Sequence, residues 1–218
     1  MMAQGMLVDA KRKWKQIDRP DISHIQDSMT MHLAPDLTWQ TLTMKEYRLK
    51  LNEFWRQHTH YLMTSRFNAS TYGQNRSFCE RNANKLKCVY CCPQPVLSKI
   101  PAERLMFVLE MNNDTNRIEG IGLVRNRAYV RRYMVYDNMN YNRYVYVGKQ
   151  RIDRRDMTQA EEWIMQWMDS LCFKGAHHMK RGQGMTSFPT EWLFHLSNVM
   201  NIVACLREMF KDRMSKQA

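Results

Sequence analysis

Apolar residues recur at helical spacing in three parts of the chain, over 43–62, 158–174 and 189–210. The first two begin with capping boxes, Thr43–Glu46 and Thr158–Glu161, in which a hydroxyl caps the first turn and the glutamate reaches back. Gly175 follows the second segment, as glycine commonly does at a helix end. The pattern therefore predicts three amphipathic helices, one early and two late in the chain.

Between the early helix and the late helices, short apolar runs alternate with turn residues, which is typical of strands. The predicted strands are 105–109, 118–124, 129–136, 142–147 and 150–152. Gly120 and Gly122 indicate that the second strand bends or that another group approaches it closely. Gly148-Lys149 is predicted to be a hairpin turn. Together these short connections indicate a mostly antiparallel sheet.

The chain divides into three regions that differ in their residue patterns. Residues 1–40 are weakly patterned and are predicted to form an arm. Residues 41–100 combine the first helix with an irregular segment, 66–100, that contains clustered cysteines. Residues 101–218 alternate strands and helices and are predicted to form the core domain. The fold class is α+β, with a small curved sheet flanked by helices and a helical N-terminal extension.

The charge of the chain favours a polyanionic partner. Its 33 Lys and Arg residues exceed 21 Asp and Glu residues, which gives a formal net charge of +12. Such a surplus attracts nucleic acid, although it also serves solubility alone. No stretch is long and apolar enough to predict a membrane span. The order of apolar and basic residues at the N-terminus is opposite to that of a secretory signal, so an intracellular location is expected.

Four of the six cysteines cluster, at Cys79, Cys88, Cys91 and Cys92. Cys-x2-Cys spacing lets two thiolates reach one tetrahedral zinc ion, so a structural zinc is one candidate cofactor. Adjacent cysteines point apart in an extended strand, and the first spacing is short for a second zinc knuckle. Reduced, partly buried thiols are the alternative.

Arginine and tyrosine alternate through residues 125–155. Guanidinium groups pair with phosphates, and aromatic faces stack on unpaired bases. Tyrosine also favours strands, and arginine also covers sheet edges, so a purely structural role stays open. The phosphate-contacting candidates in this stretch are Arg143, Lys149 and Arg151, and the stacking candidates are Tyr141, Tyr144 and Tyr146.

A glycine-containing loop, 177–184, provides a further candidate anion contact. Lys180 and Arg181 lie with two glycines ahead of the last predicted helix, so positive charge and backbone N–H groups could meet there. The spacing is not that of a Walker loop or a dinucleotide fingerprint. We expect Lys180 and Arg181 to contact phosphate.

The sequence contains no recognisable catalytic constellation, neither a nucleophile elbow nor a His-Glu-x-x-His motif. Glu110, Asp114 and Glu119 flank a predicted strand pair and could place carboxylates around a divalent metal. Turn and edge positions explain these acids equally well. An enzyme acting on nucleic acid is thus an alternative to a binding module, and we expect no catalysis.

Three segments carry a resemblance to known proteins. They are 107–126, 140–153 and 180–184. Their sequences resemble those of a family of uncharacterised proteins encoded by large and giant double-stranded DNA viruses. The resemblance covers about residues 85–212. The resemblance implies a viral source and a location in the host cytoplasm or nucleus, or in the virion. It implies no activity.

The glycine-rich segment Ile118–Val124 is also similar to a strand of PUA-like modules, the group with YTH, EVE and ASCH domains. That likeness implies a curved sheet and binding of RNA or modified DNA bases. The expected function is a nucleic-acid-binding module, with DNA or RNA as partner. The alternative is a structural or virion protein whose basic surface contacts the genome or an acidic partner.

Overall fold

A computed structural model describes residues 42–57, 61–96, 100–130, 132–175, 178–197 and 200–216. The chain forms two compact units, Met1–His58 with Pro189–Cys205, and Thr59–Phe188 with Leu206–Ala218. The second unit contains all the described strands. The arm predicted over residues 1–40 lies outside the described residues.

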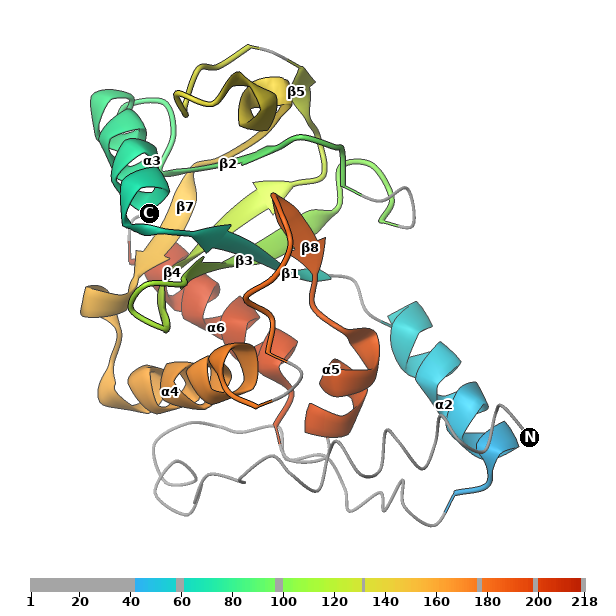
Figure 1. Cartoon of the computed structure of the whole chain (residues 1–218). Coiled ribbons are helices and arrows are strands. Elements are labelled where there is room, and N and C mark those ends of the chain that lie inside the picture. The colour runs from blue at the N-terminus through green and yellow to red at the C-terminus, as the bar shows by residue number, and fades with distance from the viewer. Residues whose placement is uncertain are drawn as a thin grey trace. The chain divides into compact units, whose positions relative to one another are not determined.

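A mixed sheet forms the centre of the second unit, with the strand order β7-β4-β3-β1-β8 (Figure 1). Its strands are β1 (Tyr61–Phe67), β3 (Leu105–Asn112), β4 (Arg117–Arg125), β7 (Gln150–Asp153) and β8 (Met185–Ser187). β1 and β3 run parallel, and the other three neighbouring pairs are antiparallel. The strands predicted over 105–109 and 118–124 are confirmed and lie in β3 and β4.

A smaller antiparallel sheet has the order β2-β6-β5. It consists of β2 (Cys88–Cys92), β6 (Tyr144–Gly148) and β5 (Tyr129–Val130). A 3-10 turn, η2 (Met139–Arg143), precedes β6, so β6 begins slightly later than predicted. The strand predicted over 129–136 is too long, because residues 132–135 have no regular structure. The α+β class and the mostly antiparallel pairing are confirmed.

The hairpin predicted at Gly148-Lys149 is wrong. β6 pairs with β2 and β5, whereas β7 pairs with β4 in the other sheet. The chain therefore crosses from one sheet to the other at this point. A Cβ atom at Gly148 would lie 2.1 Å from the carbonyl oxygen of Leu123, so only glycine fits the crossing.

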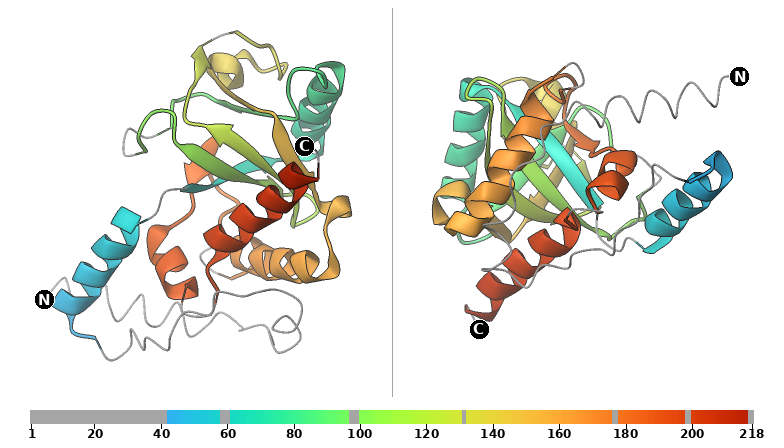
Figure 2. Two further views of the ribbon diagram at one scale, coloured as in Figure 1. Left: turned by 180° about the vertical axis from the view of Figure 1, so that it is seen from behind. Right: turned by 90° about the horizontal axis from the view of Figure 1, so that it is seen from below.

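The two faces of the central sheet are covered differently. On β3, Met106 and Val108 join the apolar core shared with the small sheet. Phe107 points the other way, and its ring lies 5.4 Å from that of Phe210 in α6 (Ile202–Ser215). Figures 1 and 2 show α4 (Gln159–Phe173) and the later turns of α6 on this second face. Because side chains alternate between the two faces of β3, the second unit has three layers: the small sheet, the central sheet, and the helices on its other face.

Helix α3 (Ala69–Arg81) lies within the segment predicted to be irregular, so that prediction is wrong for it and for β2. Asn68 caps the helix by accepting a hydrogen bond from the amide of Thr71, whose side chain reciprocates. The buried Asn75 donates to the carbonyl oxygen of Val89 on β2 at 2.7 Å. This bond holds α3 against the small sheet.

Helix α4 begins with the predicted capping box, because Thr158 and Glu161 exchange side-chain and backbone hydrogen bonds. Arg154, just before it, is buried with 4% exposure and donates to the Glu162 and Asp169 carboxylates at 2.7 and 2.8 Å. Its guanidinium also donates to the carbonyl oxygen of Ile118 on β4. Arg154 therefore joins α4 to the central sheet and is neutralised there.

The first unit contains α2 (Met44–Gln57) and α5 (Thr190–Leu196). The first predicted helix thus ends before residue 62, and the last predicted helix is divided into α5 and α6. The hydroxyl of Tyr47 lies 2.9 Å from Nε2 of His195, and both side chains are buried. None of the described helices has the length and apolar character that a bilayer crossing requires.

Candidate functional site

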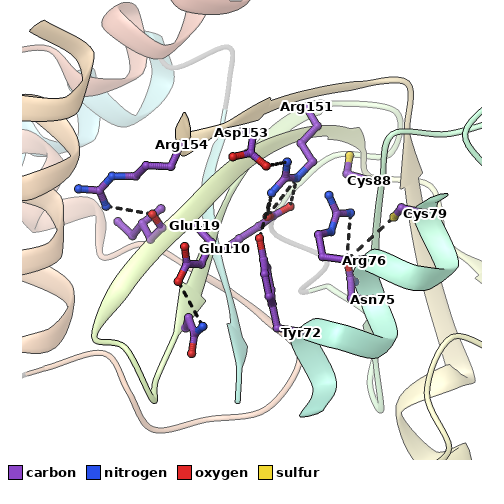
Figure 3. A network of polar contacts seen from close by, with 12 residues as sticks. Tyr72, Asn75, Arg76, Cys79, Cys88, Glu110, Glu119, Arg151, Asp153 and Arg154 are labelled. Carbon is purple, nitrogen blue, oxygen red and sulfur yellow. Dashed lines mark hydrogen bonds and ion pairs between the residues drawn. The ribbon is translucent and has the colours of Figure 1, made fainter. Parts of the chain in front are cut away.

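A buried ion pair connects two strands of the central sheet in the second unit (Figure 3). The Glu110 carboxylate on β3 has 0% exposure, and the Arg151 side chain on β7 has 7%. The Arg151 Nη2 atom lies 2.7 Å from Oε2 of Glu110, and Nε lies 3.0 Å from Oε1. Tyr90 on β2 donates its hydroxyl to the same carboxylate at 2.8 Å. Asp153 accepts from Arg151 at 2.9 Å.

The two glycines of β4 make this arrangement possible. A Cβ atom at Gly122 would lie 2.0 Å from the Tyr90 hydroxyl oxygen, and one at Gly120 would lie 2.6 Å from Nη2 of Arg151. Any side chain at either position would therefore displace the groups that reach Glu110. The close approach predicted from Gly120 and Gly122 is confirmed.

The electrostatics of this cluster keep its charges fixed. Burial lowers the pKa of Arg151, but the Glu110 carboxylate and its hydrogen bonds outweigh burial, so the net pKa is raised. Burial, followed by the Glu110 charge, raises the pKa of Tyr90 well above its usual value and that of Tyr72 to about 12. Arg151 therefore stays charged and the two tyrosines stay neutral near neutral pH, as in a structural ion pair.

The other acids proposed for metal-assisted chemistry have separate partners. Glu119 accepts hydrogen bonds from Asn112 and Thr115. Asp114 accepts from the backbone amide of Ala69 at the start of α3. These carboxylates stabilise the β3–β4 turn and the first turn of α3, and within the described residues they are not part of any group of three or more side chains that could hold a metal ion.

The four clustered cysteines do not form a zinc site, which was one of the two interpretations of their spacing. Cys88, Cys91 and Cys92 lie on one strand, whose alternation turns Cys91 away from the other two. The Cys88 thiol donates to the carbonyl oxygen of Gln150, whereas the Cys92 sulfur accepts from an amide at the start of β8. No group of three or more His, Cys, Asp or Glu side chains in the described segments could hold a metal ion. Burial raises the pKa of Cys88 to about 12 and that of Cys92 to about 11.

Two of the eight residues predicted to contact nucleic acid are buried. The guanidinium of Arg151 already donates hydrogen bonds to Glu110 and Asp153, so it is not available to bind a phosphate. Tyr146 has 1% exposure, and its hydroxyl accepts from the amide of Val96. Both assignments are corrected, because the partners of these residues are distant in sequence and bury them.

The other six candidates keep some exposure, but they do not form one group. Arg143, Lys149 and Arg181 are exposed, and Tyr141, Tyr144 and Lys180 are half-buried. Arg143 and Lys149 flank opposite ends of β6, which separates them by about 20 Å at the usual strand rise. Lys180 and Arg181 precede β8, next to the end of β2 that pairs with Tyr144.

The structure adds residues that the predicted set omitted. The Arg132 guanidinium carbon lies 5.2 Å from the ring centroid of Tyr129 and 5.6 Å from that of Tyr133. These residues belong to the arginine- and tyrosine-rich stretch 125–155. They were not among the predicted contacts, because strand alternation alone does not distinguish them from the other residues of that stretch. The register of β5 places Val130 opposite Tyr144, so Tyr129 and Tyr144 lie on neighbouring strands.

We define the basic edge as Arg132, Arg143, Tyr129, Tyr133 and Tyr144. It comprises β5, the residues after it, and the start of β6 in the small sheet. Both arginines are exposed, and neither lies within 4.0 Å of a carboxylate in the described part of the chain. The tyrosines are half-buried.

Comparisons of the chain with family models, curated proteins and solved structures give no match.

Proposed function

We propose that this protein is a nucleic-acid-binding module that uses the basic edge and performs no catalysis. The single observation that carries the proposal is the uncompensated guanidinium of Arg132 lying against two tyrosine rings. A cation–π contact orients such a guanidinium while leaving its N–H groups able to pair with a phosphate. Half-exposed tyrosines beside it supply faces on which unpaired bases can stack.

The distribution of ion pairs supports this choice of surface. Arg151, Arg154 and Arg213 are neutralised by buried or half-buried carboxylates and add little to the external field. Arg132 and Arg143 have no such partner among the described residues, so they contribute to the field around the small sheet. With a formal net charge of +12 on the chain, this field attracts a phosphate backbone.

The ligand class that suits the basic edge is single-stranded RNA or DNA, or a base exposed from a duplex. Tyrosine faces stack on any base, whereas paired bases inside a helix are inaccessible to them. A PUA-like curved sheet that takes RNA or modified DNA is the finer form of this proposal. It draws on the glycine-rich β4, whose glycines admit Tyr90 and Arg151.

A structural role is the second candidate, in which the same basic surface holds a genome or an acidic partner in a virion. The chain's charge favours it as much as it favours a binding module. Stoichiometric abundance in purified particles, with weak affinity for free oligonucleotides, would support this role instead.

The test is the salt dependence of binding to a fluorescein-labelled single strand of about 12 nucleotides, measured by anisotropy between roughly 50 and 200 mM salt. The variant R132Q/R143Q removes both arginines of the basic edge. We expect the slope of log affinity against log salt to become shallower by about 1.4, which corresponds to two lost phosphate contacts on a single strand.

The matched control is R207Q/K211Q, which removes the same charge from α6, where both residues pair with Glu208. This control should keep the wild-type slope. Equal slopes for the wild type and R132Q/R143Q would refute the proposed surface. Absence of salt-dependent binding to RNA and DNA by the wild type would refute the function itself.

A further inference from the structure

Arg66 on β1 is a half-buried arginine without a counter-charge. Its Nε atom donates to the carbonyl oxygen of Met179, and Nη1 donates to the Thr186 hydroxyl at 2.8 Å. No carboxylate lies within the 4.0 Å ion-pair distance of Arg66 among the residues that the structure describes. Burial lowers the pKa of Arg66, which reflects the cost of placing this charge away from water.

The segment 180–184 passes directly over this guanidinium. A Cβ atom at Gly182 would lie 3.5 Å from Cζ and Nη1 of Arg66, so any larger residue would cover the charged group. Gly182 has a φ of 114° and Gly184 a φ of 65°, which are conformations that glycine adopts without strain. The absence of side chains therefore keeps one approach to Arg66 open.

Two further cations precede Gly182. Arg181 is exposed and Lys180 is half-buried, and neither forms an ion pair within the described segments. The segment is anchored on both sides, since Asn113 donates to the carbonyl oxygen of Lys180 at 3.1 Å and the amide of Met185 donates to the Cys92 sulfur. These bonds fix the backbone that carries Lys180 and Arg181 next to Arg66.

We propose that Arg66, Lys180 and Arg181 form a binding site for a phosphate group, which enters beside Gly182. Arg66 presents its free guanidinium edge from the sheet, and Lys180 and Arg181 supply charge from the loop. A dianion compensates the half-buried charge of Arg66, which the protein itself leaves unpaired. A tetrahedral oxyanion suits such a set of donors, because its oxygens can accept from several donors at once.

The position of this site connects it with the basic edge. A Cβ atom at Gly184 would lie 3.0 Å from Cβ of Cys92, and Cys92 is the register partner of Tyr144. The loop therefore borders the end of the small sheet that carries Tyr144 and Arg143. The phosphate of a bound single strand is one source of the ligand, and this source rests on the proposed function. Free phosphate or a nucleotide is the other source.

The test separates the two sources. Inorganic phosphate and pyrophosphate are titrated by calorimetry into the wild type, into K180Q/R181Q and into R207Q/K211Q. We expect saturable binding by the wild type, at least a tenfold weaker association for K180Q/R181Q, and no change for R207Q/K211Q. Arg66 also contacts Met179 and Thr186, so the loop variant is preferred because it leaves these contacts in place.

The outcomes distinguish the inferred site from the proposed function. Undiminished phosphate binding by K180Q/R181Q overturns the inferred site, even if oligonucleotides still bind through the basic edge. Loss of phosphate binding in K180Q/R181Q, with no oligonucleotide binding by the wild type, keeps the site with free phosphate as its ligand and rejects the proposed function. Weakened binding of both phosphate and a labelled single strand by K180Q/R181Q supports both.

Discussion

Removing Arg151 should unfold the second unit at a much lower denaturant concentration, because it leaves the buried Glu110 carboxyl group without its guanidinium partner. In the wild type, Glu110 accepts three hydrogen bonds from Arg151 and one from Tyr90. The substitution Arg151→Met keeps similar length and bulk, yet only the Tyr90 hydroxyl remains. Removal of one partner of a buried pair typically costs about 3–5 kcal/mol, because the remaining ion has no compensation.

The double variant E110Q/R151M separates the effect of the unpaired carboxylate on stability from the effect of lost packing. Since the amide that replaces the Glu110 carboxylate carries no charge, we expect this variant to be more stable than R151M alone, by roughly half of the loss or more. The measurement is urea-induced unfolding followed by tryptophan fluorescence and far-UV circular dichroism. Arg104→Gln is the control, because Arg104 is exposed and pairs with no carboxylate among the described residues, so the midpoint should stay unchanged. A loss below about 1 kcal/mol for R151M would refute the structural role of the pair.

Three other predictions follow from the packing. Burial lowers the pKa of His195 to about 4, whereas the pKa of an unfolded histidine is near 6.5. The free energy of unfolding should therefore fall by about 3 kcal/mol as pH drops from 6.5 to 4, and His195→Gln should flatten this fall when unfolding is measured against pH. Gly122→Ala should lower stability by about 1–3 kcal/mol through collision with Tyr90, whereas Gly73→Ala, with nothing within 4 Å, should raise it by about 0.5–1 kcal/mol in thermal melts. Cys79, Cys88, Cys91, Cys92 and Cys172 are buried, so Ellman's reagent should modify them at the rate of unfolding, whereas the half-buried Cys205 can react sooner; fast modification of more than one thiol in the native protein would contradict the burial.

Local signals in the sequence were sufficient for several elements. Thr158 and Glu161 cap α4 as predicted, because a capping box requires only four consecutive residues. The continuous apolar run of β3 likewise reflects burial on both faces. In α3 the same kind of signal was missed, since Asn68 and Thr71 form its box without a glutamate and the helix carries no strong apolar stripe.

Non-local contacts account for what the sequence could not predict. Gly148-Lys149 has the composition of a hairpin turn, but β6 and β7 find their partners in different sheets. Arg151 looked available for phosphate because its ion-pair partner is 41 positions away, at Glu110. Arg66, in the middle of a strand, gave no signal at all, and its role depends on a loop more than 110 residues later.

The most direct test of the central claim is photo-crosslinking of a single strand that contains 4-thiouracil, followed by mass spectrometry of the linked peptides. Binding through the basic edge predicts crosslinks in the peptides that carry Tyr129, Tyr133 and Tyr144. Crosslinks confined to α6 or to the peptide around Lys149, or an absence of crosslinks from a strand that binds, would contradict it.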